Sequence, residues 1–352
     1  MRGLKRKAVF MNDTKIRLLG IFQDIALVEW HTVWLTKQAL AVYAALSIFI
    51  SSALAQEAKE LRLGHYPNIT HAQALLSHAN GEFEKKLCVP IRWTTFHAGP
   101  AAIEALISGA IDATYVGPNP AISGYVNTSG EGLRIVAGSA GGGAALVVRA
   151  DGGIKSNKDF NDKIIATPQL GNTQDVAARM WFQKKGYRLK EKGGNLTIIP
   201  LSCSDQFLLF KTGEIHGAWT VEPWVSRLEI EAKGKVFLEE KTLWPDGRYV
   251  TTHLVVGRKF LEQNRNLVKR LIQAHVAITQ RLNADKPSAV RTINAELKME
   301  TGKALPESVI RSALARVEFT WDPICNSLFK SAEDAHQIGF LRKRPQLEGI
   351  YD

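Results

Sequence analysis

The sequence predicts an α/β protein with two similar lobes, because segments with strand character alternate with helical segments and one pattern occurs twice. The first copy of the pattern runs from Leu61 through a turn into a helix near Ala72. The second copy runs from Lys163 through Gly171 into a helix near Asp175. The spacing between equivalent positions stays near 103 or 104 residues. We therefore expect two α/β units that face each other across a binding cleft.

Strands are expected where β-branched and apolar residues cluster between turn residues. Such segments lie at 61–66, 91–96, 113–116, 133–137, 145–149, 163–167, 196–201, 218–221, 235–239 and 249–256. Helices are expected where apolar residues recur every three or four positions, at 72–87, 100–108, 260–282, 290–297 and 306–317. Their alternation favours largely parallel sheets.

The length of 352 residues is sufficient for two domains with separate cores. We expect the chain to build lobe 1 from residues 56–148, to form lobe 2 from residues 149–252, and to complete lobe 1 with residues 253–352. Two crossovers between the lobes would form a hinge and allow closure around a ligand. The glycine-rich segment 138–143 lies between two strands and predicts a sharp or closely approached backbone there.

The N-terminal region has the features of an export signal. Residues 39–55 carry no charge, Lys37 precedes them, and Ala53-Leu54-Ala55 forms a small-residue cleavage motif. We predict residues 1–55 to be a leader with a secretory signal peptide, cleaved after Ala55, which places the mature protein in the periplasm. The alternative is a retained anchor, for which about 17 residues is a marginal length. The long segment before Lys37 belongs to this leader or precedes a later true start.

Composition and charge narrow the class of partner. The chain is 45% hydrophobic and 22% charged, as in ordinary globular proteins, and its formal net charge is +11. About +7 belongs to residues after 55, and such a surplus attracts anions through its long-range field. Basic residues do not cluster with aromatic ones on one element, so we expect no nucleic-acid partner. The odd number of cysteines (Cys88, Cys203 and Cys325) favours buried free thiols over one disulfide.

Residues 171–174 give the strongest local signal of a binding site. The sequence Gly-Asn-Thr-Gln follows a strand and opens a helix, so free backbone N–H groups and the polar side chains of Asn172, Thr173 and Gln174 meet there. A helix cap without a ligand would have the same sequence. The corresponding Asn68, Thr70 and His71 of the first copy favour an anion site over a cap alone.

Two further loops follow predicted strands, where ligands bind in open α/β sheets. The first loop contains Asn119 between two prolines, and the second contains Glu222, Pro223 and Trp224. Trp219 and Trp224 would either line a pocket for an organic group or pack in a core. A carboxylate at an anion site is unfavourable, so Glu222 would bind water, cap a helix or pair with an ammonium group of the ligand.

Gly142 and Gly143 would either let backbone amides approach a bound head group or form a tight crossing between the lobes.

Catalytic and metal-binding patterns are weak. The segment around Ser139 differs from a nucleophile elbow, because Ala137 replaces its first glycine. The histidines at positions 65, 71, 78 and 97 lack the helical spacing of a zinc motif, and there is no P-loop or dinucleotide fingerprint. We therefore expect that the protein is not an enzyme and that it binds no cofactor or metal.

Taken together, these segments resemble the periplasmic solute-binding proteins of nitrate, sulfonate and taurine ABC importers. The resemblance covers residues 60–345 and rests on Tyr66-Pro67-Asn68, the segments 108–113 and 141–148, Gly171-Asn172-Thr173-Gln174-Asp175, Gly217-Ala218-Trp219 and Glu222-Pro223-Trp224. It implies a type II periplasmic-binding-protein fold in a monomer that delivers a small oxyanion to a membrane permease and its ATPase.

By position, the resemblance implies a cleft lined by Asn68, Thr70, Asn119, Gly142, Asn172, Thr173 and Glu222. Aliphatic sulfonate or taurine is the expected ligand, with nitrate and a phosphonate as alternatives. A periplasmic anion sensor and an exported Ser–His hydrolase are the other functions considered. Pyrimidine-precursor proteins of thiamine synthesis share the fold, so fold alone does not define function.

Overall fold

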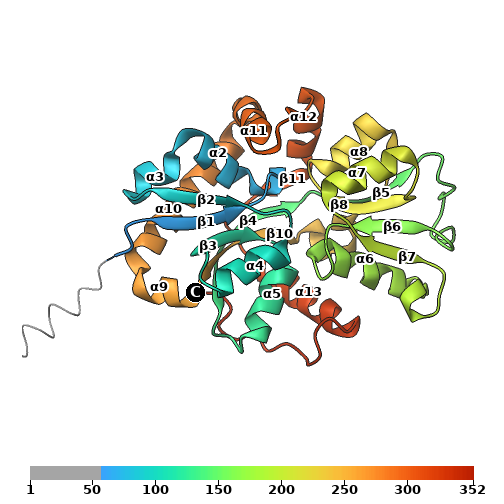
Figure 1. The fold of residues 1–352 in the computed structure, drawn as a ribbon, viewed down its shortest axis with the longest axis horizontal. Helices are drawn as coiled ribbons and strands as arrows, with labels where there is room; N and C mark the ends of the chain where they lie inside the picture. The colour runs from blue at the N-terminus through green and yellow to red at the C-terminus, as the bar shows by residue number, and fades with distance from the viewer. Residues whose placement is uncertain (1–56) are drawn as a thin grey trace, which may run out of the picture. The chain divides into compact units, whose positions relative to one another are not determined.

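The computed structural model describes residues 57–352, and the predicted signal peptide with its cleavage after Ala55 lies outside the described residues. The described part of the chain forms two lobes, each built on its own sheet with helices on both faces (Figure 1). Within residues 57–352, no helix combines the length and the apolar character needed to cross a membrane.

The sheet of the first lobe has six strands in the order β11-β4-β10-β3-β1-β2. Strand β1 runs parallel to both β2 and β3, whereas β10 runs antiparallel to β3 and β4. The six strands are β1 (Leu61–His65), β2 (Ile91–Thr95), β3 (Ala113–Val116), β4 (Leu133–Gly142), β10 (Val250–Gly257) and β11 (Val317–Phe319).

The sheet of the second lobe repeats this arrangement. Its order is β7-β6-β8-β5-β9, which matches β2-β1-β3-β10-β4 of the first sheet strand for strand, with the same parallel and antiparallel pairs. The strands are β5 (Ala144–Arg149), β6 (Ile164–Thr167), β7 (Thr197–Pro200), β8 (Gly217–Val221) and β9 (Gly234–Glu239). The prediction of two similar α/β lobes is confirmed.

The alternation of elements had predicted largely parallel sheets, but both sheets are mixed. In each sheet the strand that enters from the other lobe, β10 or β5, is antiparallel to both of its neighbours, and the parallel pairs lie on one side of it. The chain that enters a lobe from the other lobe runs against the parallel strands of that lobe. Strand direction at such a crossing depends on the path between the lobes, and local residue patterns contain no information about it.

The helices of the first lobe include the C-terminal region of the chain. They are η1 (Ile69–His71), α2 (Ala72–Asn80), α3 (Glu82–Leu87), α4 (Gly99–Ile107), α5 (Pro118–Asn127), α9 (Arg258–Gln263), α10 (Arg265–Ala284), α11 (Lys286–Thr301), α12 (Glu307–Arg316) and α13 (Cys325–Gln337). The helix predicted at 72–87 is divided at Gly81, whose φ of +66° lies in the left-handed region. The helix predicted at 260–282 is divided at Asn264, which lies outside helical geometry.

The second lobe carries α6 (Thr173–Lys184), η2 (Lys190–Lys192), α7 (Cys203–Thr212), α8 (Trp224–Ala232), η3 (Glu240–Leu243) and η4 (Pro245–Gly247). In Figure 1, α11 and α12 of the first lobe extend toward α7 and α8 of the second along one side, and α13 lies near α6 along the other. The C-terminal helices therefore reach the second lobe on both sides of the crossings.

Both crossings between the lobes occur a few residues earlier in the chain than the predicted boundaries at 148/149 and 252/253. Strand β4 ends at Gly142 in the first sheet, and β5 begins at Ala144 in the second, while β10 re-enters the first sheet at Val250. Gly142 and Gly143 have φ values of +69° and +73°, which end β4 and redirect the chain. The run of apolar residues from 144 to 149 identified a strand correctly, but such a run does not show which sheet the strand joins.

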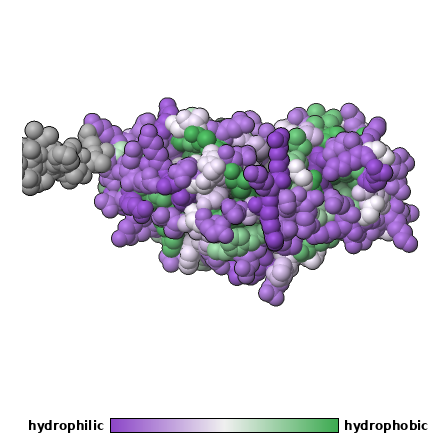
Figure 2. Space-filling model, turned by 90° about the horizontal axis from the view of Figure 1, so that it is seen from below, coloured by the Kyte–Doolittle hydropathy of each residue, from purple (hydrophilic) through white to green (hydrophobic). Residues whose placement is uncertain are grey.

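Strand β4 is also closely approached by another part of the chain, as the glycines at 138–143 predicted. A Cβ atom on Gly138 would lie 2.0 Å from the backbone oxygen of Asp322. Each lobe buries apolar clusters against its sheet. The face in Figure 2 is mostly hydrophilic, with small, scattered hydrophobic patches.

The three cysteines are unpaired, as expected, but they are not all buried. Cys88 is exposed, and Cys203 and Cys325 are half-buried. Cys88 directly follows α3 in a left-handed conformation, so its side chain lies at a turn on the surface and not on the apolar face of the helix.

Candidate ligand-binding site

A cavity lies between the lobes at the carboxyl ends of parallel strands from both sheets. Its volume is about 30 Å³, room for only a few water-sized atoms. Segments that follow β1, β2 and β3 contribute from the first lobe, segments that follow β6 and β7 and the end of β8 contribute from the second, and β10 completes it. The lining residues are Tyr66, Asn68, Thr70, His71, His97, Gly99, Gly117, Pro120, Pro168, Asn172, Thr173, Gln174, Cys203, Val221, Thr251 and Thr252.

The start of α6 supplies donors from the second lobe. Asn172 is the N-cap residue, and its side chain makes no hydrogen bond to the helix. The N–H groups of the first turn therefore lack a side-chain cap. Thr173 is only 4% exposed, and its hydroxyl Oγ1 is buried without a hydrogen-bond partner. A free hydroxyl beside the free N–H groups of a helix start can donate hydrogen bonds to an oxyanion.

Asp175 places a carboxylate in the first turn of the same helix, but its charge is neutralised within the protein. Its oxygens accept hydrogen bonds from the Thr167 hydroxyl (2.8 Å) and the Gly171 N–H (3.0 Å). Arg179 pairs with both oxygens at 3.0 Å. Asp175 thus fixes the loop before α6 and does not face the cavity as a free anion.

The first lobe contributes the turn after β1. Asn68, Thr70 and His71 are buried and line the cavity with Tyr66. The hydroxyl of Tyr66 is buried without a partner, as that of Thr173 is. His71 Nδ1 accepts the Tyr66 N–H at 3.3 Å, and burial holds the pKa of His71 well below its usual 6.5. His71 is therefore neutral at physiological pH.

Strand β10 contributes Thr251 and Thr252, which sequence reasoning did not assign to the site. The Thr251 hydroxyl donates to the Gly142 carbonyl at 2.5 Å, so this residue connects the cavity with the first crossing. Two adjacent threonines in a strand of valine and leucine were the available signal. His97 and Cys203 were also missed, and burial raises the pKa of the Cys203 thiol to about 11, which keeps it protonated.

The electrostatic character of the cavity follows from this set of residues. None of the residues that line it in the described part of the chain is Lys, Arg, Asp or Glu. Hydroxyls, amides, the neutral imidazole of His71 and backbone N–H groups are among its polar groups. Such a cavity suits a small monoanion, because neutral donors solvate its charge without requiring a buried counter-ion.

Three predicted residues lie outside the cavity in the first lobe and at the crossing. The Asn119 side chain donates to the Ser331 carbonyl at 3.2 Å and so attaches α5 to α13. Gly142 and Gly143 form the crossing itself, and a Cβ atom on Gly143 would lie 2.6 Å from Val317 Cγ2. Of the two functions considered for this glycine pair, the structure shows the tight crossing.

Trp219 and Glu222 also lie away from the cavity. Trp219 is fully buried in the core of the second lobe, where its indole N–H donates to Glu240 Oε2 at 2.7 Å. Glu222 caps α8 by accepting the Ser226 N–H (3.1 Å) and hydroxyl (2.9 Å), and it pairs with Arg316 at 3.1 Å. Burial raises its pKa to about 7 in spite of these partners. Helix capping was one of the functions considered for Glu222.

Trp224 lies beside the cavity, in the wall of a second pocket of about 430 Å³. Its indole N–H donates to Asn68 Oδ1 at 3.3 Å, which joins the two lobes at the edge of the first cavity. His97 lines both spaces. The second pocket therefore lies directly next to the cavity and combines apolar walls with the guanidinium of Arg227.

Ser139, the serine considered for a hydrolase, lies inside the first lobe. Its hydroxyl donates to Gln73 Oε1 at 2.9 Å, and it is fully buried on β4. It does not line the cavity between the lobes.

Two α/β lobes joined by crossing strands, with a polar cavity between them, form the fold of periplasmic binding proteins. The fold matches the alkanesulfonate-binding protein of Xanthomonas axonopodis pv. citri bound to MOPS, with a TM-score of 0.71, 19% identity and coverage of 84% of this chain and 99% of that one. It also matches the periplasmic nitrate-binding protein of Synechocystis PCC 6803, with a TM-score of 0.66, 15% identity and coverage of 81% and 83%.

The chain belongs to the NMT1-like family, whose model matches residues 54–297. It is 24% identical to the taurine-binding periplasmic protein of Escherichia coli (strain K12) over 210 residues, which are 59% of this chain and 62% of that protein. The chain thus spans less than two thirds of the length of this relative. It is 27% identical over 237 residues to a Brucella abortus (strain 2308) protein named only as a binding protein, with coverage of 66% and 70%.

Proposed function

We propose that this protein is the periplasmic solute-binding component of an ABC importer and that it captures a small oxyanion between its lobes. The observation that carries the proposal is the Thr173 hydroxyl, which is buried and unpartnered at the uncapped start of α6. The Tyr66 hydroxyl, also buried and unpartnered, lines the same cavity from the opposite lobe. Donors from both lobes would meet on one anion, so binding would favour the closed arrangement.

The ligand class that fits best is an aliphatic sulfonate, including taurine, with nitrate and a phosphonate as alternatives. A sulfonate carries a single negative charge and three acceptor oxygens, which suits a cavity of neutral donors. Its organic part would extend past Trp224 into the second pocket, because that pocket adjoins the cavity at Asn68 and His97. The taurine-binding relative and the alkanesulfonate-binding structural neighbour support this choice.

Delivery of the solute would follow from closure. The cavity holds only about 30 Å³, so a sulfonate would enter and leave through separation of the lobes at the crossings. A membrane permease with its ATPase would recognise the closed form of the monomeric protein. Export would depend on the signal peptide predicted within residues 1–55.

A panel of anions tests the proposal. We expect taurine or a short alkanesulfonate to stabilise the protein more than acetate or chloride at equal concentration. At 100 times the dissociation constant the gain is about 2.7 kcal/mol, which raises Tm by several degrees. Differential scanning fluorimetry with taurine, methanesulfonate, nitrate, methylphosphonate and acetate measures it. The proposal is wrong if taurine, methanesulfonate, nitrate and methylphosphonate all raise Tm no more than acetate does.

Replacement of Thr173 by valine tests the position of the anion. We expect about a 10- to 100-fold loss of affinity for the stabilising anion, because a hydrogen bond to a charged group contributes about 1.5–3 kcal/mol. Isothermal titration calorimetry measures the loss. Thr212→Val is the matched control, since Thr212 is exposed at the end of α7 and its hydroxyl bonds only to nearby groups. Equal affinities of the two variants would place the anion elsewhere.

A further inference from the structure

Two histidines and two glutamates from distant parts of the sequence meet in the first lobe, outside the cavity between the lobes. His65 is at the end of β1, His78 is near the end of α2, and Glu296 and Glu300 lie four residues apart on α11. One turn of α11 thus presents both carboxylates to the same neighbours. The spacing of the histidines could not reveal this cluster, because both carboxylates come from the C-terminal part of the chain.

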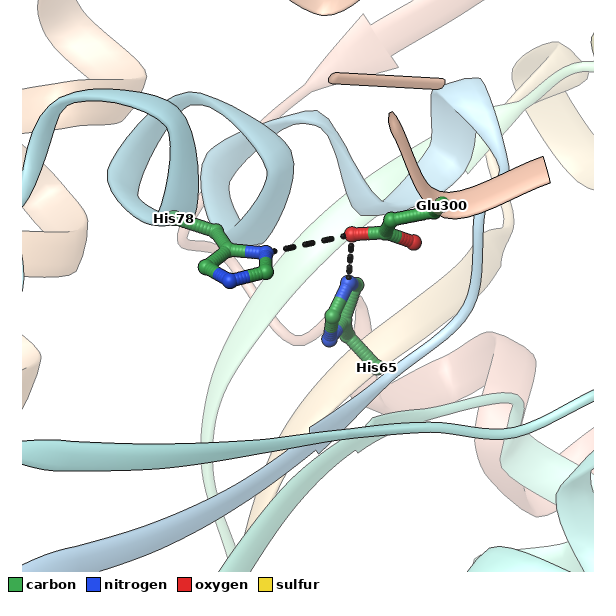
Figure 3. A group of neighbouring side chains, drawn as sticks. All are labelled: His65, His78 and Glu300. Carbon is green, nitrogen blue, oxygen red and sulfur yellow. Dashed lines mark hydrogen bonds and ion pairs between the residues drawn. The ribbon is translucent and has the colours of Figure 1, made fainter. Parts of the chain in front are cut away.

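The ligand atoms of the cluster converge on one point. His65 Nε2 lies 2.5 Å from Glu300 Oε1, and His78 Nδ1 lies 3.3 Å from the same oxygen. Figure 3 shows both imidazole rings directed at this oxygen, from β1 on one side and α2 on the other. Glu296 Oε1 lies 2.8 Å from His78 Nδ1. The donor atoms of His65, His78 and Glu300 all lie within 4.8 Å of one another.

The cluster is enclosed and has unused bonding capacity. The side chains of His65, Glu300 and Glu296 are 0%, 5% and 10% exposed, and His78, at 35%, forms the outer side of the cluster. Glu300 Oε2 is buried without a hydrogen-bond partner. The Trp93 ring packs against both imidazoles, with ring centroids 5.3 Å from His65 and 4.9 Å from His78. An enclosed set of imidazole and carboxylate groups behind an aromatic wall resembles a metal site more than a surface ion pair.

We propose that His65, His78 and Glu300, with Glu296 as fourth donor, bind a divalent transition-metal ion of the zinc type. Zinc takes four imidazole or carboxylate ligands at about 2.0–2.2 Å in tetrahedral geometry. Such bonds place the donors about 3.3 Å apart. The His65–Glu300 pair at 2.5 Å would therefore separate by less than 1 Å and the His78–Glu296 pair at 2.8 Å by less, while the His78–Glu300 pair already has this spacing. Two carboxylates balance the charge of the ion, and two neutral imidazoles complete the set.

The site would have a structural effect. Its ligands come from a strand and two helices, so one ion would fasten α11 to β1 and α2. Four protein ligands leave no open position for a substrate, as in structural zinc sites. Glu300 also lines the second pocket beside Trp224. The ion would therefore stiffen a wall of that pocket without contacting the anion held at α6.

Metal titration of the tag-free protein, stripped with EDTA and dialysed, tests the proposal. We expect one Zn²⁺ per chain by isothermal titration calorimetry and a rise in Tm that EDTA reverses. Co²⁺ should bind at the same site with the visible absorption of a four-coordinate ion. The absence of Zn²⁺ and Co²⁺ binding to the wild-type protein would overturn the proposal and show that the cluster is only an ion-pair network.

A double variant locates the ion. His78→Gln/Glu296→Gln should weaken Zn²⁺ binding by at least about 100-fold, because it removes two of four ligands. His216→Gln/Glu307→Gln makes the same two exchanges away from the cluster and should bind Zn²⁺ as the wild type does. Equal Zn²⁺ affinity of the two double variants would contradict the site. If the first variant does not fold, X-ray absorption of the zinc-loaded wild type must show two imidazole ligands, and fewer would also contradict it.

The anion panel keeps this inference separate from the proposed function. Neither His78 nor Glu296 lines the cavity between the lobes. We therefore expect the His78→Gln/Glu296→Gln variant to retain the rise in Tm that the anion causes.

Discussion

Replacement of Arg316 by methionine should lower the free energy of unfolding by about 3–5 kcal/mol at pH 8, the range found when one partner of a buried ion pair is removed. Arg316 ends α12 in the first lobe and reaches three glutamates of the second lobe. Its guanidinium lies 3.1 Å from Glu222, 2.5 Å from Glu229 and 3.3 Å from Glu239. Glu222 is fully buried, so the variant would leave a carboxylate without its cation.

The pH dependence of this loss follows from Glu222. Burial raises the pKa of Glu222 to about 7 even with Arg316 present. Without Arg316 its pKa rises further, so at pH 5 the carboxyl is protonated and its charge no longer has to be buried. The loss should then fall to the cost of unsatisfied hydrogen bonds, about 1–3 kcal/mol. Urea unfolding at pH 5 and pH 8 measures both values.

Two further variants serve as comparisons for the unfolding of Arg316→Met. Arg311→Met removes an exposed pair with Glu307 on the same helix, and it should change stability by less than about 0.5 kcal/mol. Adding Glu222→Gln to Arg316→Met should recover part of the loss at pH 8, because the uncompensated charge is then absent. If Arg311→Met and Arg316→Met cost the same, the bridge between the lobes would not stabilise the protein.

The architecture was predictable because it is repeated within the sequence. The strand, turn and helix around Thr70 and around Thr173 have the same order of apolar and polar residues, and the matching strand orders of the two sheets confirm the repeat. The crossings were less predictable. Gly142 and Gly143 were recognised as unusual, but a positive φ at these positions depends on the path between the lobes, which no local pattern specifies.

The candidate site was predictable at helix starts and less so elsewhere. Asn172 and Thr173 line the cavity because the start of a helix after a parallel strand points to the carboxyl edge of the sheet. Trp219 and Asn119 could not be placed from the sequence. A tryptophan in a strand faces either side by a shift of one residue, and Asn119 bonds to α13, which lies more than 200 residues away in the chain.

The cluster of His65, His78, Glu296 and Glu300 and the threonines of β10 were also not predictable from the sequence. His65 and Glu300 meet only because α11 packs on α2, and Thr251 reaches the cavity only because the chain returns from the second lobe at β10. Both contacts join elements that are distant in sequence. Residue type and spacing identify local features such as caps and turns, whereas these groups are defined by tertiary packing.

Replacement of Glu240 by glutamine should change how stability depends on pH. Glu240 is fully buried in the second lobe, and burial raises its pKa to about 7 although Trp219 donates a hydrogen bond to it. A carboxyl whose pKa is raised by folding contributes stability that is present below pH 4.5 and is lost as the pH rises through 7. The glutamine side chain cannot ionise, and its carbonyl oxygen can still accept the Trp219 N–H.

The stability of Glu240→Gln relative to the wild type should therefore rise by roughly 2–3 kcal/mol between pH 5 and pH 8. Guanidinium unfolding of both proteins at several pH values measures the difference, and all other titrating groups cancel in the comparison. Glu214→Gln, an exposed exchange in the same lobe, should show no such trend. If the stability difference between Glu240→Gln and the wild type does not vary with pH, Glu240 has the same pKa in the folded and unfolded states. Its burial beside Trp219 would then have no effect on its proton affinity.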